Sequence, residues 1–157
     1  MNNEQLILNA HNKDEYPPAH SAEHILNQTM VRMFGCGRSR HTHIERKKSK
    51  LDYPLPSCPT AEDIAEIERK VNEIIAQNLP VTMEYMPKEE ARALFDLSKL
   101  PEDASETLRI IRIGDYDACP CLGTHVQNTS EIGTFRISST RYENGVFRIV
   151  FRLGNNP

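Results

Sequence analysis

The sequence of 157 residues contains no tryptophan, and only 6% of its residues are aromatic. It also lacks an apolar run of the roughly 18–20 residues that a membrane-spanning helix needs. The first residues contain neither a basic segment nor a long apolar segment, so no secretory signal is visible. From these absences we expect a cytoplasmic protein with no secretory leader and no membrane partner.

An excess of positive charge is missing as well. Nineteen Lys and Arg residues stand against 22 Asp and Glu residues, and the formal net charge is −3. Proteins that coat nucleic acid without specificity carry positive charge over most of their surface. The balance excludes that class of protein, and we expect no DNA partner.

The sequence does contain an unusual combination of six histidines and four cysteines. A chain of this length can form one domain with its own core, so four cysteines are not needed as a disulfide scaffold. Cytoplasmic thiols are more often buried, metal-bound or catalytic than paired. The first question is therefore whether these cysteines and histidines meet in the fold.

Three segments have the apolar spacing of helices. Their ranges are 21–34, 60–78 and 88–97. Gly35 ends the first helix, and we expect the pair Pro17-Pro18 to lie before its start. Thr60 and Asp63 resemble a capping box at the start of the second helix, which is the most clearly amphipathic of the three.

Four further segments read as strands, and a looser antiparallel pair is expected within residues 38–53. The four ranges are 81–86, 108–113, 133–139 and 146–153. The last two form a hairpin, because Asn144-Gly145 supplies the positive φ angles of a tight turn. This order predicts an α+β fold with an antiparallel-rich sheet and helices packed on one of its faces. Residues 1–16 precede the pattern and read as an N-terminal arm, with room for one short strand at Leu6-Ile7-Leu8.

Two pairs of residues have the spacing of metal ligands. His20 and His24 stand four residues apart, which places both rings on one helix face with Cβ atoms about 5–6 Å apart. Cys121 and His125 have the same spacing. Thiolate and imidazole groups suit zinc better than magnesium or calcium. The histidine pair alone fits a half-buried polar helix edge better than a metal site, but the two pairs together predict a zinc site.

The number of ligands decides what such a site does. Four protein ligands make a closed, structural zinc site, whereas a catalytic zinc keeps one position for water or substrate. Both arrangements stay open here, since three of the four residues could bind while the fourth accepts a proton. We interpret the remaining cysteines, Cys36, Cys58 and Cys119, as small buried side chains without a role in the site.

A longer motif surrounds the second pair. From Cys121 the sequence reads Cys-x-Gly-Thr-His-Val, followed by Thr129 and by Glu131-Ile132-Gly133. This run resembles the editing domain shared by alanyl-tRNA and threonyl-tRNA synthetases, and most of all the free-standing alanyl-tRNA editing deacylases. In that family an early His-x₃-His and a late Cys-x₃-His supply the zinc ligands, and both occur here in that order. The resemblance extends from about His20 to Leu153.

The resemblance implies a zinc-dependent hydrolase that removes Ser or Gly from alanine tRNA in trans. The implied metal ligands are His20, His24, Cys121 and His125, and the implied editing domain occupies residues 17–157 after the arm at 1–16. A synthetase pocket discriminates by only about 1–3 kcal/mol per methylene, so a second, hydrolytic site improves accuracy. A synthetase catalytic domain does not fit in 157 residues, and we expect no aminoacylation.

The candidate catalytic residues are Cys121, Thr124 and Glu23. Thr124, or the backbone amides beside Gly123, could stabilise an oxyanion. Glu23 stands where such editing sites often have Thr, and it could act as a general base or be only a solvated helix carboxylate. Leu122 stands where the family often has Gly, and it adds bulk beside the metal loop.

A basic cluster within residues 38–50 is a candidate surface for tRNA. It contains one acidic residue, Glu45, and six basic ones: Arg38, Arg40, Arg46, Lys47, Lys48 and Lys50. Such a cluster could bind the phosphates of an acceptor stem without reading its sequence, or it could be a solvated hairpin. Two rival functions stay open, namely a zinc-stabilised tRNA-binding or regulatory module without hydrolysis and a metal-free remnant of an editing domain.

Overall fold

The computed structural model describes residues 16–95, 97 and 106–154. The described chain contains three helices, which are α2 (Pro17–Phe34), α3 (Ala61–Ala76) and α4 (Lys88–Leu94). In this part of the chain, no helix combines the length and the apolar character needed to cross a membrane. The short strand expected at Leu6-Ile7-Leu8 lies outside the described residues.

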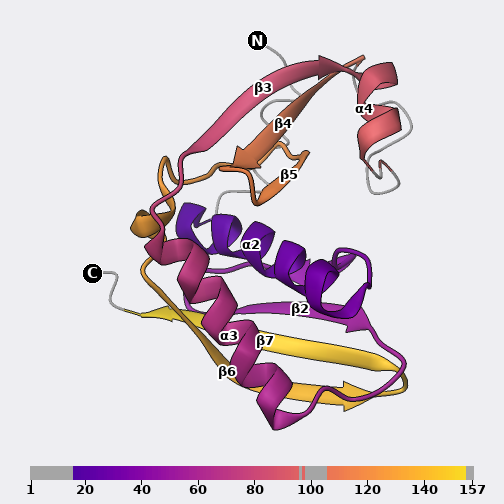
Figure 1. Cartoon of the computed structure of the whole chain (residues 1–157), viewed down its shortest axis with the longest axis vertical. Helices are drawn as coiled ribbons and strands as arrows, with labels where there is room; N and C mark the ends of the chain where they lie inside the picture. The colour runs from indigo at the N-terminus through magenta and orange to yellow at the C-terminus, as the bar shows by residue number, and fades with distance from the viewer. Residues whose placement is uncertain (1–15, 96, 98–105, 155–157) are drawn as a thin grey trace.

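The strands form two antiparallel sheets. The larger has the order β1-β2-β7-β6, and its strands are β1 (His41–His43), β2 (Ser49–Pro54), β6 (Thr134–Glu143) and β7 (Val146–Gly154). The smaller has the order β3-β4-β5, and its strands are β3 (Val81–Pro87), β4 (Thr107–Ile113) and β5 (Asp117–Pro120). Helices α2 and α3 cover one face of the larger sheet, and the smaller sheet lies on the other side of α2 (Figure 1). The α+β class is confirmed, while the division into two sheets was not expected.

Aliphatic and phenyl side chains fill the main core in the absence of tryptophan. Phe135 and Phe151 lie on the inner face of the larger sheet with ring centroids 4.9 Å apart, and both are buried. Tyr53 is also buried, and its hydroxyl donates to Asn27 Oδ1 at 2.7 Å. A buried hydroxyl needs a hydrogen-bond partner. Because this partner lies on α2, the bond ties β2 to that helix.

Helix α2 begins earlier than expected. Pro17 and Pro18 occupy its first turn rather than preceding it. Proline is tolerated there because the first amides of a helix have no partner within the helix. The helix ends as expected at Gly35, whose φ of 69° is left-handed. Because α2 lies between the two sheets, it buries polar side chains as well as apolar ones, among them Ser21, Glu23, His24 and Asn27.

Local signals located the other helix starts and the hairpin turn. The capping box is present: Asp63 N–H donates to Thr60 Oγ1 at 3.0 Å, and Thr60 N–H donates to Asp63 Oδ2 at 2.9 Å. The turn between β6 and β7 has positive φ at Asn144 and Gly145. Two helix ends were expected too late, since α3 stops at Ala76 and α4 at Leu94.

The capping box predicts the effect of one substitution. Thr60→Ala removes the acceptor of the Asp63 amide, and we expect it to lower the free energy of unfolding by about 1 kcal/mol. Denaturant unfolding followed by circular dichroism measures this change. Ser57→Ala, at an exposed position before the helix, is the control and should have little effect. Equal stability of the two variants would contradict the prediction.

Candidate metal centre

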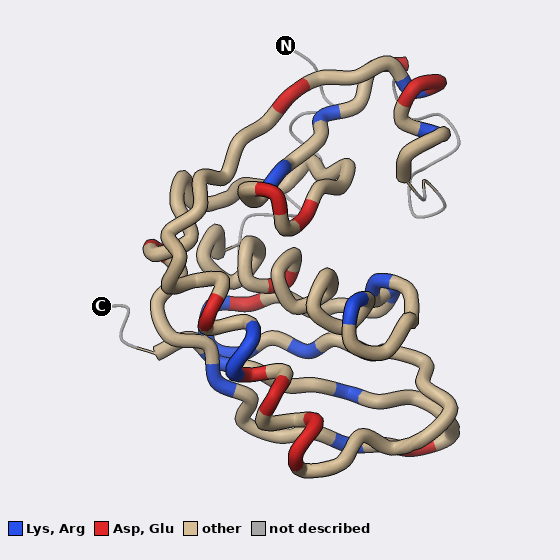
Figure 2. The backbone as a smooth tube through the Cα atoms, viewed as in Figure 1, with Lys and Arg blue, Asp and Glu red and all other residues tan. Residues whose placement is uncertain are grey.

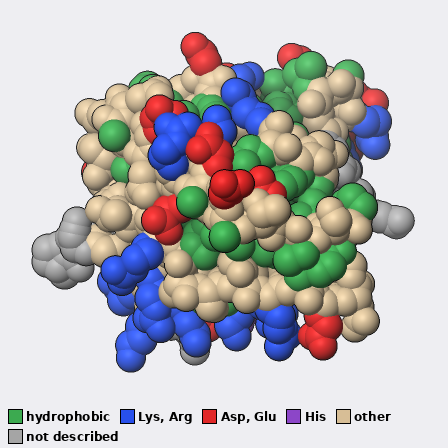
Figure 3. Space-filling model, turned by 60° about the horizontal axis from the view of Figure 1, so that its bottom comes forward, with side chains coloured by type: hydrophobic (Ala, Val, Ile, Leu, Met, Phe, Trp, Pro, Cys, Tyr) green, Lys and Arg blue, Asp and Glu red, His purple; other side chains and the backbone are tan. Residues whose placement is uncertain are grey.

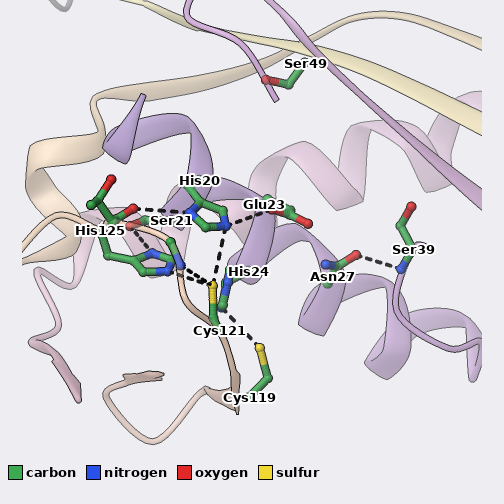
Figure 4. Close-up of polar contacts among 12 residues, drawn as sticks. His20, Ser21, Glu23, His24, Asn27, Ser39, Ser49, Cys119, Cys121 and His125 are labelled. Atoms are coloured by element: carbon green, nitrogen blue, oxygen red, sulfur yellow. Dashed lines mark hydrogen bonds and ion pairs between the residues drawn. The ribbon is translucent and has the colours of Figure 1, made fainter. Parts of the chain in front are cut away.

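The structure brings both ligand-like pairs together where the start of α2 meets the loop after β5. His20 and His24 lie on α2, and Cys121 and His125 lie on the loop. One ligand atom from each of the four lies within 4.8 Å of the others. Figure 4 shows these side chains pointing toward one another. The two pairs are far apart in the sequence, and the packing of β5 against α2 brings them together in the fold.

The spacing of the donor atoms fits a tetrahedral zinc ion. Cys121 Sγ lies 3.6 Å from His20 Nε2 and 3.5 Å from His125 Nε2. Zinc bonds of about 2.3 Å to sulfur and about 2.05 Å to nitrogen, opened at the tetrahedral angle, separate the two atoms by about 3.6 Å. Three imidazoles and one thiol also form a donor set that zinc prefers. These residues could therefore hold a zinc ion with little rearrangement.

Neighbouring groups turn the imidazoles so that Nε2 faces the thiol. His20 Nδ1 donates to the backbone carbonyl of Thr124 at 3.2 Å. His125 Nδ1 lies 2.9 Å from Ser21 Oγ, which also accepts the amide of Val126 at 3.2 Å. Such partners fix the orientation of metal-binding histidines and tune their affinity. Ser21 was not identified from the sequence, although its place beside His20 on α2 was visible.

Arg109 of β4 holds the loop that carries Cys121. Its Nε donates to the carbonyl of Cys121 at 2.9 Å, and its Nη2 donates to the carbonyl of Gly123. The amide of Gly123 points at Cys121 Sγ, 3.4 Å away. This amide therefore stabilises the thiolate. Nothing local in the sequence marked Arg109, because its contacts depend on how β4 pairs with β5.

The ionisation of the cluster follows from its contacts. Burial alone would raise the pKa of the Cys121 thiol, but hydrogen bonds from the three imidazoles lower that pKa to about 2. Burial lowers the pKa of His125 to about 4. Burial also acts against a charged His24, yet the neighbouring Cys119 and Asp117 hold its pKa well above the ordinary value. Cys121 is therefore a thiolate and His125 is neutral near pH 7, which are the forms that bind metal, whereas the raised pKa of His24 means that a metal ion would displace a proton from it.

A second group of side chains contacts His24 from the opposite side. His24 Nδ1 lies 3.4 Å from Cys119 Sγ and 3.5 Å from Asp117 Oδ2. Cys119 was interpreted as a small buried side chain without a role in the site; it is half-buried and lies against a site histidine. Cys58 was also expected to be buried, and it is exposed. Cys36 is half-buried and packs against the main core.

The basic cluster divides in the structure. Arg38 turns inward and forms an ion pair with Asp117, with only 26% of its side chain exposed. The guanidinium of Arg46 lies over the ring of Tyr16, 4.3 Å from its centroid. Arg40, Lys47 and Lys48 are exposed, and Lys50 is half-buried. Figure 2 shows that basic residues gather at the end of the larger sheet nearest the C-terminus.

The remaining site residues expected from the sequence lie around the cluster. Glu23 is buried, and its Oε1 lies 3.5 Å from His20 Nε2, so it is not a solvated helix carboxylate. Thr124 is exposed on the loop beside His125. Leu122 is 64% exposed, so it adds apolar surface beside the site and does not fill it.

Comparisons with known proteins agree with this arrangement. Residues 108–150 match the family described as the "Threonyl and Alanyl tRNA synthetase second additional domain". An alanine–tRNA ligase from Treponema denticola is 33% identical over 132 residues, which cover 83% of this chain and 22% of that protein. An alanine–tRNA ligase from Pyrobaculum aerophilum is 32% identical over 152 residues, covering 86% of this chain and 16% of that protein.

Fold and site together define a small α+β domain with a cluster of three histidines and one cysteine. The comparisons place this domain: it is an editing domain of the alanyl- and threonyl-tRNA synthetase type. The chain spans less than a quarter of the length of these relatives. The matched family segment contains Cys121 and His125, whereas His20 and His24 precede it.

The thiolate state of Cys121 predicts how its alkylation depends on pH. A thiol with a lowered pKa stays anionic as the pH falls, whereas burial raises the pKa of Cys36. In metal-free protein we expect iodoacetamide to label Cys121 at nearly the same rate at about pH 8 and about pH 5, while labelling of Cys36 falls steeply. Peptide mapping by mass spectrometry measures both rates. A parallel decline at the two cysteines would contradict the assignment.

Proposed function

We propose that the protein is a zinc-dependent aminoacyl-tRNA deacylase that acts in trans in the cytoplasm. Its substrate would be alanine tRNA mischarged with Ser or Gly, and residues 17–157 would form the editing domain after an N-terminal arm at 1–16. One observation carries the proposal: His20, His24, Cys121 and His125 converge with the donor spacing of tetrahedral zinc. The similarity to alanine–tRNA ligases supports the choice of substrate class.

The surrounding residues suit ester hydrolysis. Bound zinc would supply Lewis acidity, polarising a carbonyl or lowering the pKa of a water toward about 7. Glu23 lies beside His20, and its carboxylate would accept the proton that an attacking water loses. The exposed hydroxyl of Thr124 would donate to the oxyanion that forms on the ester. Cys121 would act as a metal ligand and not as a nucleophile, because its thiolate points into the cluster.

A second function is favoured by the completeness of the cluster. Four protein ligands within 4.8 Å of one another could fill a tetrahedral shell. A filled shell would make the protein a zinc-stabilised tRNA-binding or regulatory module without hydrolytic activity. The deacylase requires that one of the four gives way to water or substrate.

The surface proposed to hold tRNA is wider than the hairpin found in the sequence. We call it the basic edge and define it as Arg46, Lys47, Lys48, Lys50, Arg136 and Arg152. Arg136 of β6 pairs directly with Arg152 of β7, although like charges in this position destabilise a sheet. Arg152 also donates to the carbonyl of Lys47 at 3.5 Å, which joins the strands to the hairpin. Within the described residues, no member of the basic edge forms an ion pair with a carboxylate.

Charge complementarity favours a polyphosphate partner at the basic edge. Phosphates neutralise closely spaced guanidinium and ammonium groups and release bound counterions when they bind. Figure 3 shows Lys and Arg side chains gathered along the lower edge of one face of the molecule. The start of β6 and the end of β7, which carry Arg136 and Arg152, lie at the same end of the molecule as the start of α2 (Figure 1). A tRNA held there would keep its single-stranded 3′ end near the metal centre.

The deacylase proposal predicts release of Ser or Gly from mischarged alanine tRNA. We expect Cys121→Ala to reduce this release to the uncatalysed rate, because it removes a metal ligand, and a chelator to do the same. Cys58→Ala, which changes an exposed cysteine away from the site, is the matched control and should keep full activity. The assay uses alanine tRNA charged with Ser, Gly, Ala or Thr, with and without chelator. Undiminished turnover in metal-free protein would refute zinc dependence, and zinc-loaded protein without any turnover would favour the tRNA-binding module.

The basic edge predicts a salt-dependent affinity for uncharged tRNA. We expect Arg136→Ala and Arg152→Ala each to weaken binding and to reduce the slope of log affinity against log salt by about one. Arg69→Ala is the control, because Arg69 is exposed on α3 and already paired with Glu66. Fluorescence anisotropy over a salt series measures the slopes. If all three variants bind like the original protein, tRNA does not use this surface.

A further inference from the structure

A buried carboxylate lies directly behind the metal centre. Asp117 begins β5, and none of its side chain is exposed. Arg38 binds it as a fork, with Nη1 2.6 Å from Oδ1 and Nη2 3.2 Å from Oδ2. Gln28 Nε2 adds a third donor at 2.9 Å. The carboxylate is therefore fixed in both position and charge, since a buried anion needs such partners.

The same carboxylate faces one nitrogen of His24. Asp117 Oδ2 lies 3.5 Å from His24 Nδ1, and only 4% of the histidine side chain is exposed. An imidazole whose Nδ1 points at a carboxylate presents Nε2 on the opposite side of its ring. The rings of His20 and His125 lie close to His24, with centroids 5.3 and 4.5 Å from its own, and one nitrogen of His24 lies within 4.8 Å of the donor atoms of the other three residues.

We propose that Asp117 is a positioning residue that accepts the Nδ1 proton of His24 and so commits Nε2 to the metal. The two hydrogen bonds from the Arg38 guanidinium keep the Asp117 carboxylate in this position. The inference rests on the metal centre of the proposed function but not on its hydrolytic reaction. A carboxylate that orients a metal-binding histidine in this way also raises the basicity of that histidine.

Cys119 is the competing acceptor for the same proton. Its Sγ lies 3.4 Å from His24 Nδ1, which is no farther than the carboxylate oxygen. Sulfur is a weak acceptor, whereas hydrogen bonds to a carboxylate are charge-assisted and stronger. Asp117 is also held by two other side chains, so its oxygen stays in place. These differences favour the carboxylate over the thiol.

The inference changes the role of Arg38. Both terminal nitrogens of its guanidinium bind Asp117, and most of its side chain is buried. A phosphate would have to compete with a buried carboxylate for these donors. Arg38 therefore belongs to the support of the metal centre, in contrast to the residues of the basic edge.

Zinc affinity of the full chain, measured by competition with a chromophoric chelator, tests the inference. We expect Asp117→Asn to weaken zinc binding by about 10- to 100-fold, because an amide nitrogen or oxygen replaces a charged acceptor. Asp52→Asn is the matched control: Asp52 forms a similar fork with Arg148, at 2.8 and 3.1 Å, on the larger sheet. It should leave the zinc affinity unchanged. An equal loss in both variants, or no loss in Asp117→Asn, would overturn the inference.

Two further variants separate the alternatives. Arg38→Met should weaken zinc binding while leaving affinity for uncharged tRNA unchanged, and a loss of tRNA binding alone would overturn the assignment of Arg38. Cys119→Ala should leave zinc affinity unchanged. If Cys119→Ala loses zinc and Asp117→Asn does not, the thiol is the acceptor and the inference fails.

The tautomer of His24 can be read without any substitution. Long-range ¹H–¹⁵N NMR of the zinc-loaded protein distinguishes a protonated imidazole nitrogen from a metal-bound one. We expect Nδ1 of His24 to carry the proton and Nε2 to bind zinc. Zinc on Nδ1 would overturn the inference, and this test holds even if Asp117→Asn does not fold.

Discussion

The packing of α2 between two sheets is the constraint on which the site depends. One side of the helix forms the core with the larger sheet, and the other side meets β5 and the loop that follows it. Polar side chains that would be solvated on a surface helix are therefore buried, and each needs a partner. His20, Ser21 and His24 find those partners on residues about a hundred positions later in the chain. The metal centre is thus also one of the contacts that join α2 to the smaller sheet and the loop after β5.

Each buried charge around the cluster has a neighbour of opposite charge or a hydrogen-bond donor. The Cys121 thiolate faces three imidazoles, and Arg109 ties down the loop carbonyls beside it. Behind His24, the negative charge of Asp117 is balanced by Arg38. A divalent ion would add positive charge where the thiolate and the Glu23 carboxylate already lie. Without an ion, a proton on His24 offsets part of this negative charge, and a metal ion would take the place of that proton.

Local signals explain which features the sequence predicted. Gly35, the Thr60–Asp63 capping box and the Asn144-Gly145 turn each act within a few residues, and all three lie where expected. The two ligand pairs were visible because a spacing of four residues is also local. The contacts of Asp117, Cys119 and Arg109 were not visible, because they depend on strand pairing and on the packing of β5 against α2. Strand β5 itself was missed, since four residues ending in proline are too short to show an alternating pattern.

X-ray absorption of the zinc-loaded protein shows directly which side chains bind the metal. We expect one zinc per chain with a single sulfur neighbour at about 2.3 Å and nitrogen or oxygen neighbours at about 2.0–2.1 Å. Cys121 would supply that sulfur, while Cys119 would stay outside the coordination shell beside His24. A shell with two sulfurs, or a protein that binds no zinc, would contradict a zinc site formed by His20, His24, Cys121 and His125.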